Sequence, residues 1–410
     1  MENIFDYAEK YCNIDFDEFS YNKLDALIFS QLAYIEYEKI FEFNSPLTLI
    51  DIWRIITETY SEDELLQFSL IMQKAILLLC IISNGKRYRN IVAKDYRNEV
   101  FNAEEKQFSA LTFEMQNGEN IIAFRGTDET LSGLKESAAL SFTFPIYSQI
   151  QAIKYLNEHL KNDNKKYHLT GHSKGGNLSV YSAVECNDDL KNRIIDIYNF
   201  DGPGFSNEYI KSKSYDLINE KITTIVPEGS IIGRIFNHDE KILIVESEEH
   251  GISQHHIYNW HVNDNDFEYS TSANYSSVLF EKTINDVLMN VEKEKIESVF
   301  ETLFEILDAT DAKTLNEIKE LKAEKFVEVL KVLDNKDAEN QRYVIEILTL
   351  MVKFGIINIM PEIKYDFNDF LDYIKSGKIS YAKIQEKAKI SNLKNKVNMK
   401  NIDKNINKLS

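Results

Sequence analysis

Residues 167–183, YHLTGHSKGGNLSVYSA, contain the pattern that decides the fold. The run YHLT is typical of a β-strand, NLSVYSAV is typical of a helix, and the pentapeptide GHSKG (171–175) stands between them. G-x-S-x-G is short and arises by chance in many proteins. At the junction of a strand and a helix, however, it is typical of a sharp turn, the elbow, that holds its serine in strained backbone geometry. We therefore expect Ser173 to project above the sheet, beside the positive end of the helix, as a candidate nucleophile.

Apolar strands and helical stretches alternate on both sides of the elbow. Asn117-Gly118 lies between two strand-like runs and is typical of a hairpin turn. Residues 20–40 and 61–84 are expected to be helical, with Ser61 and Glu64 as a capping box. This alternation predicts an α/β fold with a mainly parallel central sheet covered on both faces. The expected strands are 107–115, 120–125, 166–170, 193–200, 222–226 and 241–246, and the expected helices between them are 148–163, 174–186 and 206–219.

The remainder of the chain predicts two further regions. After an α/β domain at 1–275, apolar residues recur three and four apart with charged opposite faces, which predicts a helical appendage at 280–372. Residues 375–410 hold ten lysines against Glu386 and Asp403, a local balance of +8. We expect this basic tail to be solvated and flexible. A basic helix that weakly contacts anionic lipid is the alternative.

The composition argues against several classes of protein. The 410 residues carry 47 Lys and Arg against 66 Asp and Glu, and the net charge of −19 repels nucleic acid. Cys12, Cys80 and Cys186 are far apart, so they form neither a disulfide framework nor a zinc-binding spacing. The longest apolar run, AILLLCII at 75–82, is too short to span a bilayer, and MENIFDYAEK lacks a signal-peptide pattern. We expect a soluble, cytoplasmic protein of undetermined oligomeric state.

A nucleophilic serine needs a base and a group that orients the base. In α/β-hydrolases these residues follow one another in the order Ser, Asp or Glu, His. The run GISQHHIYNWHV (251–262) comes after the last predicted strand, where a loop can reach back to the elbow. His255 in this run is the best candidate base, and His256 is the second.

Several groups could orient the base. Asp201, in DGPGF at the end of one predicted strand, is slightly favoured, and Glu228 at the end of the next strand is the alternative. A Ser–His dyad without an acid is a third possibility, and Asp201 could instead cap the turn made by GPG (202–204).

Two backbone amides should form an oxyanion hole. Lys174 supplies one because it follows the nucleophile, and Thr127, after Gly126, is expected to supply the other.

Three motifs together resemble a known family. FRGTD (124–128), GHSKGGN (171–177) and FDGPGF (200–205) are similar to motifs of the class 3, or fungal-type, lipases. They are closer still to an uncharacterised bacterial branch of lipase-like α/β-hydrolases that also carries a late QH. The likeness runs from FSYNKLDALIFSQLAYIEY near the N-terminus to about residue 265. It implies an α/β-hydrolase fold with Ser173 as nucleophile, His255 as base and the Thr127 region as oxyanion hole.

The sequence departs from this family in two places. Ser230 stands where class 3 lipases carry their acid, so that residue cannot be carried over. Leu134 and Ser137 stand where the bacterial branch would have Trp and Asp.

Three functions remain open from the sequence. The leading hypothesis is a serine hydrolase that cleaves a small acyl ester or a lipid, with no metal and no cofactor. The rival is an inactive hydrolase-like scaffold that binds a lipid or protein partner. A metal-dependent hydrolase is the third, since His250, His255, His256 and His261 lie close together in the chain, but no HExxH or cysteine spacing supports it.

Overall fold

The computed structural model describes residues 1–41, 46–101, 106–127, 137, 139–162, 164–274, 277–279, 281–282, 284–285, 291–309, 332–333 and 335–353. The expected basic tail at 375–410, Leu134 and most of the expected helical region beyond 309 lie outside these residues. Contacts divide the chain into two compact units, Met1–Lys293 and Glu294–Ser410. The domain limits expected from the sequence stay a prediction.

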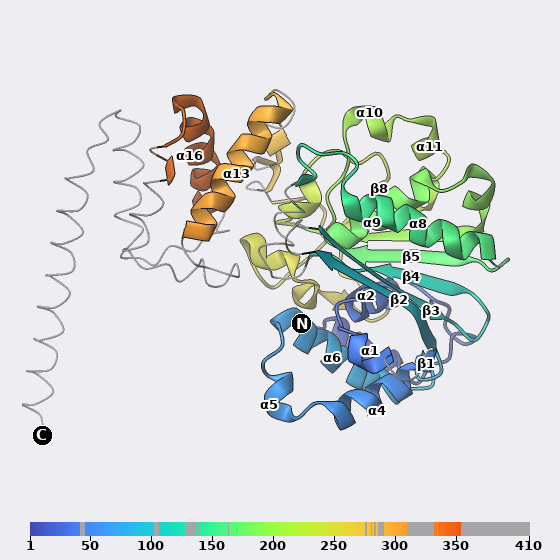
Figure 1. The fold of residues 1–410 in the computed structure, drawn as a ribbon. Helices are drawn as coiled ribbons and strands as arrows, with labels where there is room; N and C mark the ends of the chain where they lie inside the picture. Colours follow the sequence, from blue (N-terminus) through green and yellow to red (C-terminus); the bar gives the residue numbers. More distant parts are fainter. Residues whose placement is uncertain are drawn as a thin grey trace, which may run out of the picture. The chain divides into compact units, whose positions relative to one another are not determined.

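Eight strands form one sheet whose order follows the chain (Figure 1). The first three neighbouring pairs are antiparallel, and the four pairs that follow β4 are parallel. The expected α/β class with a mainly parallel central sheet is confirmed, and this architecture is consistent with an α/β-hydrolase fold. The strands are β1 (Leu47–Thr48), β2 (Val92–Phe101), β3 (Lys106–Glu114), β4 (Asn120–Phe124), β5 (Tyr167–His172), β6 (Ile194–Phe200), β7 (Ile222–Pro227) and β8 (Lys241–Val245).

The sheet is buried on both faces because helices cover each of them (Figure 1). All residues of β4 are buried, and alternate side chains enter opposite cores. Ile121 and Ala123 pack with the N-terminal helices, whereas Ile122 and Phe124 pack on the other face. The first core includes α1 (Ile4–Tyr11), α2 (Lys23–Leu32), α4 (Leu49–Thr59) and α6 (Leu70–Ser83), and the second includes α8 (Tyr147–Asn162) and α9 (Lys174–Glu185).

Some expected helices are divided by serines that cap new turns. The single helix expected at 206–219 is wrong: the structure has α10 (Asn207–Ile210) and α11 (Lys213–Asp216). Ser206 and Ser212 each accept a hydrogen bond from the backbone N–H three residues later, so each begins its own turn. Short 3₁₀ turns complete this part of the chain, at η2 (Asp188–Arg193), η3 (Asn219–Lys221) and η4 (Ile232–Arg234).

The helices expected near the N-terminus are also divided. The helix expected at 20–40 is α2 followed by α3 (Glu38–Phe41), and the helix expected at 61–84 is α5 (Glu62–Leu65) followed by α6. The side chain of Ser69 accepts a hydrogen bond from the N–H of Met72 and starts α6. The capping box of Ser61 and Glu64 is confirmed at the start of α5.

A buried ion pair anchors α2 to the turn between α6 and β2. Asp25 accepts hydrogen bonds from Arg87 Nε at 2.9 Å and from the hydroxyl of Tyr88 at 2.6 Å. Neither the Asp25 nor the Arg87 side chain is exposed. The Arg87 guanidinium also lies 3.9 Å from the centre of the Phe16 ring. Both buried charges therefore have several partners, and these compensate for their removal from water.

The first residues of the chain pack against a hairpin late in the sequence, β9 (Val262–Asn263) and β10 (Asp266–Phe267). The N–H of Val262 donates to the carbonyl of Glu2 at 2.9 Å. Tyr11 donates to Asp264 at 2.7 Å, and Lys23 pairs with Asp266 at 2.9 Å. The N-terminal helices and this hairpin therefore belong to one folded unit.

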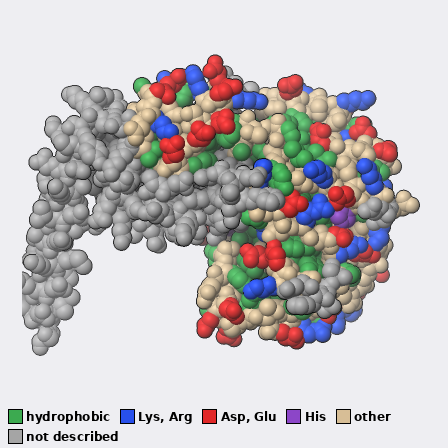
Figure 2. Space-filling model, viewed as in Figure 1, with side chains coloured by type: hydrophobic (Ala, Val, Ile, Leu, Met, Phe, Trp, Pro, Cys, Tyr) green, Lys and Arg blue, Asp and Glu red, His purple; other side chains and the backbone are tan. Residues whose placement is uncertain are grey.

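The second unit contains α13 (Lys293–Ala309), which begins at its boundary, and α16 (Ala338–Lys353). Val299, Leu303 and Ile306 of α13 share a small core with Leu333 and Val344. In the described part of the chain, no helix is both long enough and apolar enough to cross a bilayer. On the face shown in Figure 2, acidic and basic side chains are interspersed.

Candidate active site

Ser173 lies at the junction of β5 and α9, as the sequence predicts. Its φ of 59° and ψ of −131° are in a region that residues with a side chain rarely adopt. A strained residue of this kind costs about 1–3 kcal/mol and persists only where its surroundings hold it. The backbone N–H of Ser173 donates to the carbonyl of Phe200, at the end of β6, at 2.9 Å.

Glycines allow the elbow to be this tight. A Cβ atom on Gly171 would lie 2.2 Å from the backbone of Gly175. A Cβ on Gly175 would lie 2.1 Å from the carbonyl oxygen of Phe124, in β4. Both separations are far shorter than van der Waals contact, so only glycine fits at either position.

His255 lies beside the elbow and bonds to Asp201. The loop that carries it contains two 3₁₀ turns, η5 (Gly251–His255) and η6 (Ile257–Asn259). His255 Nδ1 lies 2.7 Å from Asp201 Oδ2, and the ring of His255 lies 4.5 Å from that of His172. His250 and His256 are exposed. Gln254 holds the loop from inside, since its Oε1 accepts from the N–H of Gly229 at 2.7 Å.

Asp201 is completely buried, and both of its carboxylate oxygens have partners. Oδ2 faces His255, whereas Oδ1 accepts from the hydroxyl of Ser230 at 2.5 Å and from the N–H of Gly233 at 3.2 Å. Glu228, the alternative acid, points elsewhere: its Oε2 accepts from the hydroxyl of Ser270 at 3.4 Å. Ser230, after β7, thus donates to the carboxylate that follows the neighbouring strand, β6.

The sequence reasoning missed His172, although it directly precedes Ser173. His172 Nε2 lies 2.8 Å from the backbone carbonyl of His255, and Nδ1 lies 3.0 Å from the hydroxyl of Tyr34. Burial, together with the charge of His255, holds the pKa of His172 well below its ordinary value, so the ring is neutral. A neutral ring with a carbonyl at Nε2 donates from Nε2 and accepts the Tyr34 proton at Nδ1. His172 therefore ties the backbone of the loop to the elbow.

The loop expected to complete the site also reaches the elbow. A Cβ on Gly126 would lie 3.3 Å from Ser173 Cβ and 2.4 Å from the carbonyl oxygen of His172. Thr127 follows directly, and its hydroxyl bonds to that of Ser137. The Lys174 side chain is buried and donates to the carbonyl of Gln107 at 3.1 Å, so it secures the start of α9 to β3.

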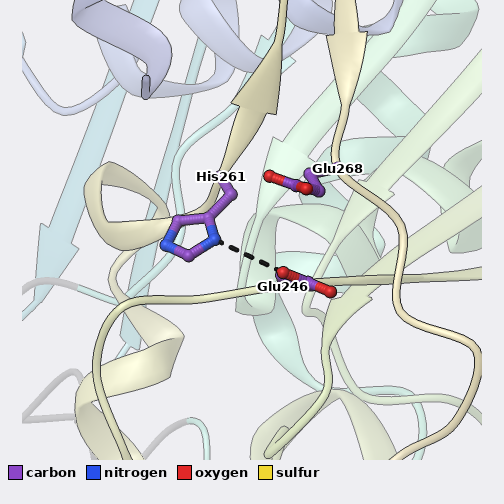
Figure 3. Close-up of side chains that lie close together, drawn as sticks. All are labelled: Glu246, His261 and Glu268. Atoms are coloured by element: carbon purple, nitrogen blue, oxygen red, sulfur yellow. Dashed lines mark ion pairs between the residues drawn. The ribbon is translucent and has the colours of Figure 1, made fainter. Parts of the chain in front are cut away.

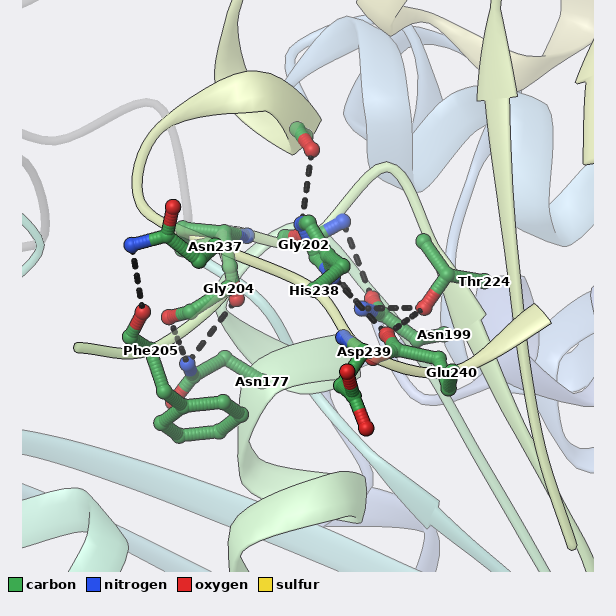
Figure 4. A network of polar contacts seen from close by, with 12 residues as sticks. Asn177, Asn199, Gly202, Gly204, Phe205, Thr224, Asn237, His238, Asp239 and Glu240 are labelled. Atoms are coloured by element: carbon green, nitrogen blue, oxygen red, sulfur yellow. Dashed lines mark hydrogen bonds and ion pairs between the residues drawn. The ribbon is translucent and has the colours of Figure 1, made fainter. Parts of the chain in front are cut away.

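The turn that carries Asp201 rests on a polar network (Figure 4). Asn199 Oδ1 accepts from the N–H of Gly202 at 2.9 Å, and Asn177 Nδ2 donates to the carbonyl of Pro203 at 3.0 Å. Asn199 Nδ2 also donates to the hydroxyl of Thr224, which in turn donates to Glu240.

Glu240 is the charged end of this network. Burial would raise its pKa, but the hydrogen bond and charge of His238, 2.8 Å away, together with the hydroxyl donors, lower the pKa to about 2. Glu240 is therefore ionised at neutral pH. Among its side-chain partners the sequence shows only His238 beside it, because the others, Thr224 of β7 and Tyr215 of α11, are distant in sequence.

Comparisons with known proteins place the chain in a family. The Mbeg1-like family model matches residues 82–305, which is more than half of the chain and includes Ser173, Asp201 and His255. Among solved structures, the M37 lipase crystal structure is similar with 20% sequence identity and a TM-score of 0.34, over 53% of this chain and 71% of that one. None of the curated proteins matches the chain. The chain belongs to the Mbeg1-like family.

Proposed function

We propose that this protein is a serine hydrolase that cleaves an acyl ester with Ser173 as nucleophile, His255 as base and Asp201 as orienting acid. One observation carries the proposal: His255 Nδ1 lies 2.7 Å from the buried carboxylate of Asp201. The backbone of the same histidine is bonded to the residue next to Ser173. A base held from two sides beside a strained serine is the arrangement that nucleophilic catalysis requires.

The proposed reaction has two stages. His255 donates a hydrogen bond from Nδ1–H to Asp201 and keeps that proton, so the lone pair of Nε2 is free to take the proton of Ser173 as its oxygen attacks the ester carbonyl. The ester C–O bond then breaks, His255 Nε2 returns the proton to the departing alcohol, and the acyl group remains on Ser173. His255 Nε2 then takes a proton from a water molecule as the water attacks the acyl carbonyl. The bond between the acyl carbon and the Ser173 oxygen breaks, His255 returns the proton to that oxygen, and the carboxylic acid leaves. The Asp201 carboxylate stabilises the imidazolium that forms in each stage.

The negative charge that develops on the carbonyl oxygen during attack needs hydrogen-bond donors. We assign this role to the backbone amides of Thr127 and Lys174, and the close approach of Gly126 to Ser173 supports the first assignment. The tie of the Lys174 side chain to Gln107 supports the second, because it fixes the start of α9. The resemblance of the three sequence motifs to lipases supports a lipid or small acyl ester as substrate. Hydrolysis rates on a panel of esters that differ in acyl chain length would identify the preferred chain length.

A fluorophosphonate probe tests the proposal directly. The protein should be labelled, whereas Ser173→Ala and His255→Ala should lose both labelling and ester hydrolysis. The double variant should be little worse than either, because residues that act as one unit are not additive. His256→Ala is a matched control, because His256 is the exposed neighbour of His255, and it should keep most activity. An unlabelled, correctly folded protein without activity on any ester would favour the scaffold that binds a lipid or protein partner.

A further inference from the structure

We propose that Glu246, His261 and Glu268 form a binding site for a divalent cation at the base of the loop that carries His255. A nitrogen of His261 and one carboxylate oxygen of each glutamate lie within 4.8 Å of one another. Figure 3 shows the imidazole and the two carboxylates gathered in one place. The site does not depend on the hydrolase function proposed above, because it lies outside the group formed by Ser173, His255 and Asp201.

The backbone fixes the three residues against one another. The N–H of Glu246 donates to the carbonyl of Glu268 at 2.9 Å, and the N–H of Glu268 donates to that of His261 at 3.0 Å. The N–H of His261 donates to the carbonyl of Glu246 at 2.9 Å, so the three residues are joined by a cycle of backbone hydrogen bonds. Three separate backbone segments therefore present their side chains from directly paired positions. The positions of the ligands are built into the β-pairing and need no ion to bring them together.

His261 gives the independent indication of a ligand. It is only 7% exposed, and neither of its ring nitrogens has a hydrogen-bond partner in the described part of the structure. A buried polar group without a partner is rare and costly. Its Nδ1 faces Glu246 Oε2 at 3.7 Å, which is too far for a hydrogen bond. Two ligands on one metal, each bonded at about 2.1 Å, lie roughly 3.0–3.5 Å apart, so this spacing is nearly that of a metal site.

The two glutamates add the charge that a cation would neutralise. Like charges on directly paired strands repel each other. A bound cation would remove that repulsion and give Nδ1 of His261 a partner at the same time. Both glutamates are partly exposed, so an ion can enter and the carboxylates can close the small remaining distance. One imidazole and two carboxylates suit Zn²⁺, with water in the remaining position, whereas Ca²⁺ and Mg²⁺ favour oxygen ligands alone.

The site would tie together both ends of the histidine loop. Glu246 directly follows β8, and His261 directly precedes β9, so the residues between them form the loop. Ser247 and Trp260 already pair across its base. A cation held at this point adds a second closure, and it should therefore stabilise the folded protein by mass action.

The test uses metal-stripped Ser173→Ala protein, so that its result does not depend on catalysis. Calorimetric titration with zinc chloride should show one ion bound per chain. At a hundredfold excess over Kd, zinc should raise Tm by about 4–8 °C. Glu246→Gln and Glu268→Gln should each weaken binding at least tenfold. Glu248→Gln, an exposed residue of the same loop, is the matched control and should bind zinc normally.

Two results would overturn the proposal. If zinc addition gives no heat of binding and no change in Tm, the cluster is an ion pair with His261 and not a metal site. If zinc binds equally to both glutamine variants but is lost in His250→Ala, an exposed histidine captures the ion. Since His261 is buried, its replacement can impair folding. The test therefore relies on the two glutamine variants.

Discussion

At the scale of single residues, Asp201 is the carboxylate to which the structure joins His255. Asp201→Asn should lower kcat by roughly 10⁴-fold, because an amide favours the wrong tautomer of the base. Glu228→Gln should change kcat only slightly, since Glu228 faces Ser270. Steady-state rates on one ester substrate compare the two variants. A larger loss in Glu228→Gln than in Asp201→Asn would show that Glu228 serves as the orienting acid.

At the scale of elements, the contact between α9 and the sheet depends on Gly175. Gly175→Ala should destabilise the protein by about 3 kcal/mol or more, because the new methyl group meets the rigid backbone of β4. Gly118→Ala is the control: Gly118 has φ +83° in an open turn, so its loss should cost about 1 kcal/mol of strain alone. Denaturant unfolding gives both values. Similar losses would mean that the elbow can move away from β4.

Two histidines of β5 should give opposite pH dependences. Burial would lower the pKa of His168, but the hydrogen bond and charge of Asp196 outweigh it and raise the pKa. Its stabilisation is therefore complete below about pH 6.5 and is lost as pH rises through the raised pKa. The pKa of His172 is lowered, so the unfolded chain alone takes up a proton, and stability is lost as pH falls below about 6.5.

Unfolding free energies at roughly pH 5.5 and pH 8.5 test this pair. The destabilisation caused by His168→Asn should be larger at the lower pH. That caused by His172→Asn should be larger at the higher pH. The same trend in both variants would contradict the assigned protonation states.

Local signals made the elbow predictable from sequence. The strand, the glycine-flanked Ser173 and the helix follow one another directly, and each has its own pattern. The division of 206–219 was missed because helical periodicity does not show that Ser206 and Ser212 start new turns. The cluster of Glu246, His261 and Glu268 could not be predicted, because the pairing of backbone segments decides which acidic residues near His261 meet it.

At the scale of the whole molecule, the Asp25–Arg87 pair fixes the N-terminal helices. Arg87→Ala should destabilise the protein by about 3–5 kcal/mol, because it leaves a buried carboxylate without its cation. Arg89→Ala, at an exposed position two residues later, should cost less than about 0.5 kcal/mol. Thermal and denaturant unfolding measure both. A small effect of Arg87→Ala would mean that water reaches Asp25.

The contact between α1 and the hairpin of β9 and β10 can form only late in synthesis. Tyr11 and Asp264 are bonded, although 253 residues separate them. At ribosomal speeds of about 5–20 residues per second, Asp264 is made about 10–50 s after Tyr11. During that interval α1 and α2, whose Ile4, Leu24 and Leu27 share one apolar core with Val262 and Phe267, lack the hairpin. The helices α1 and α2 are thus made well before the hairpin that packs against them, and we expect chaperones to bind them during synthesis.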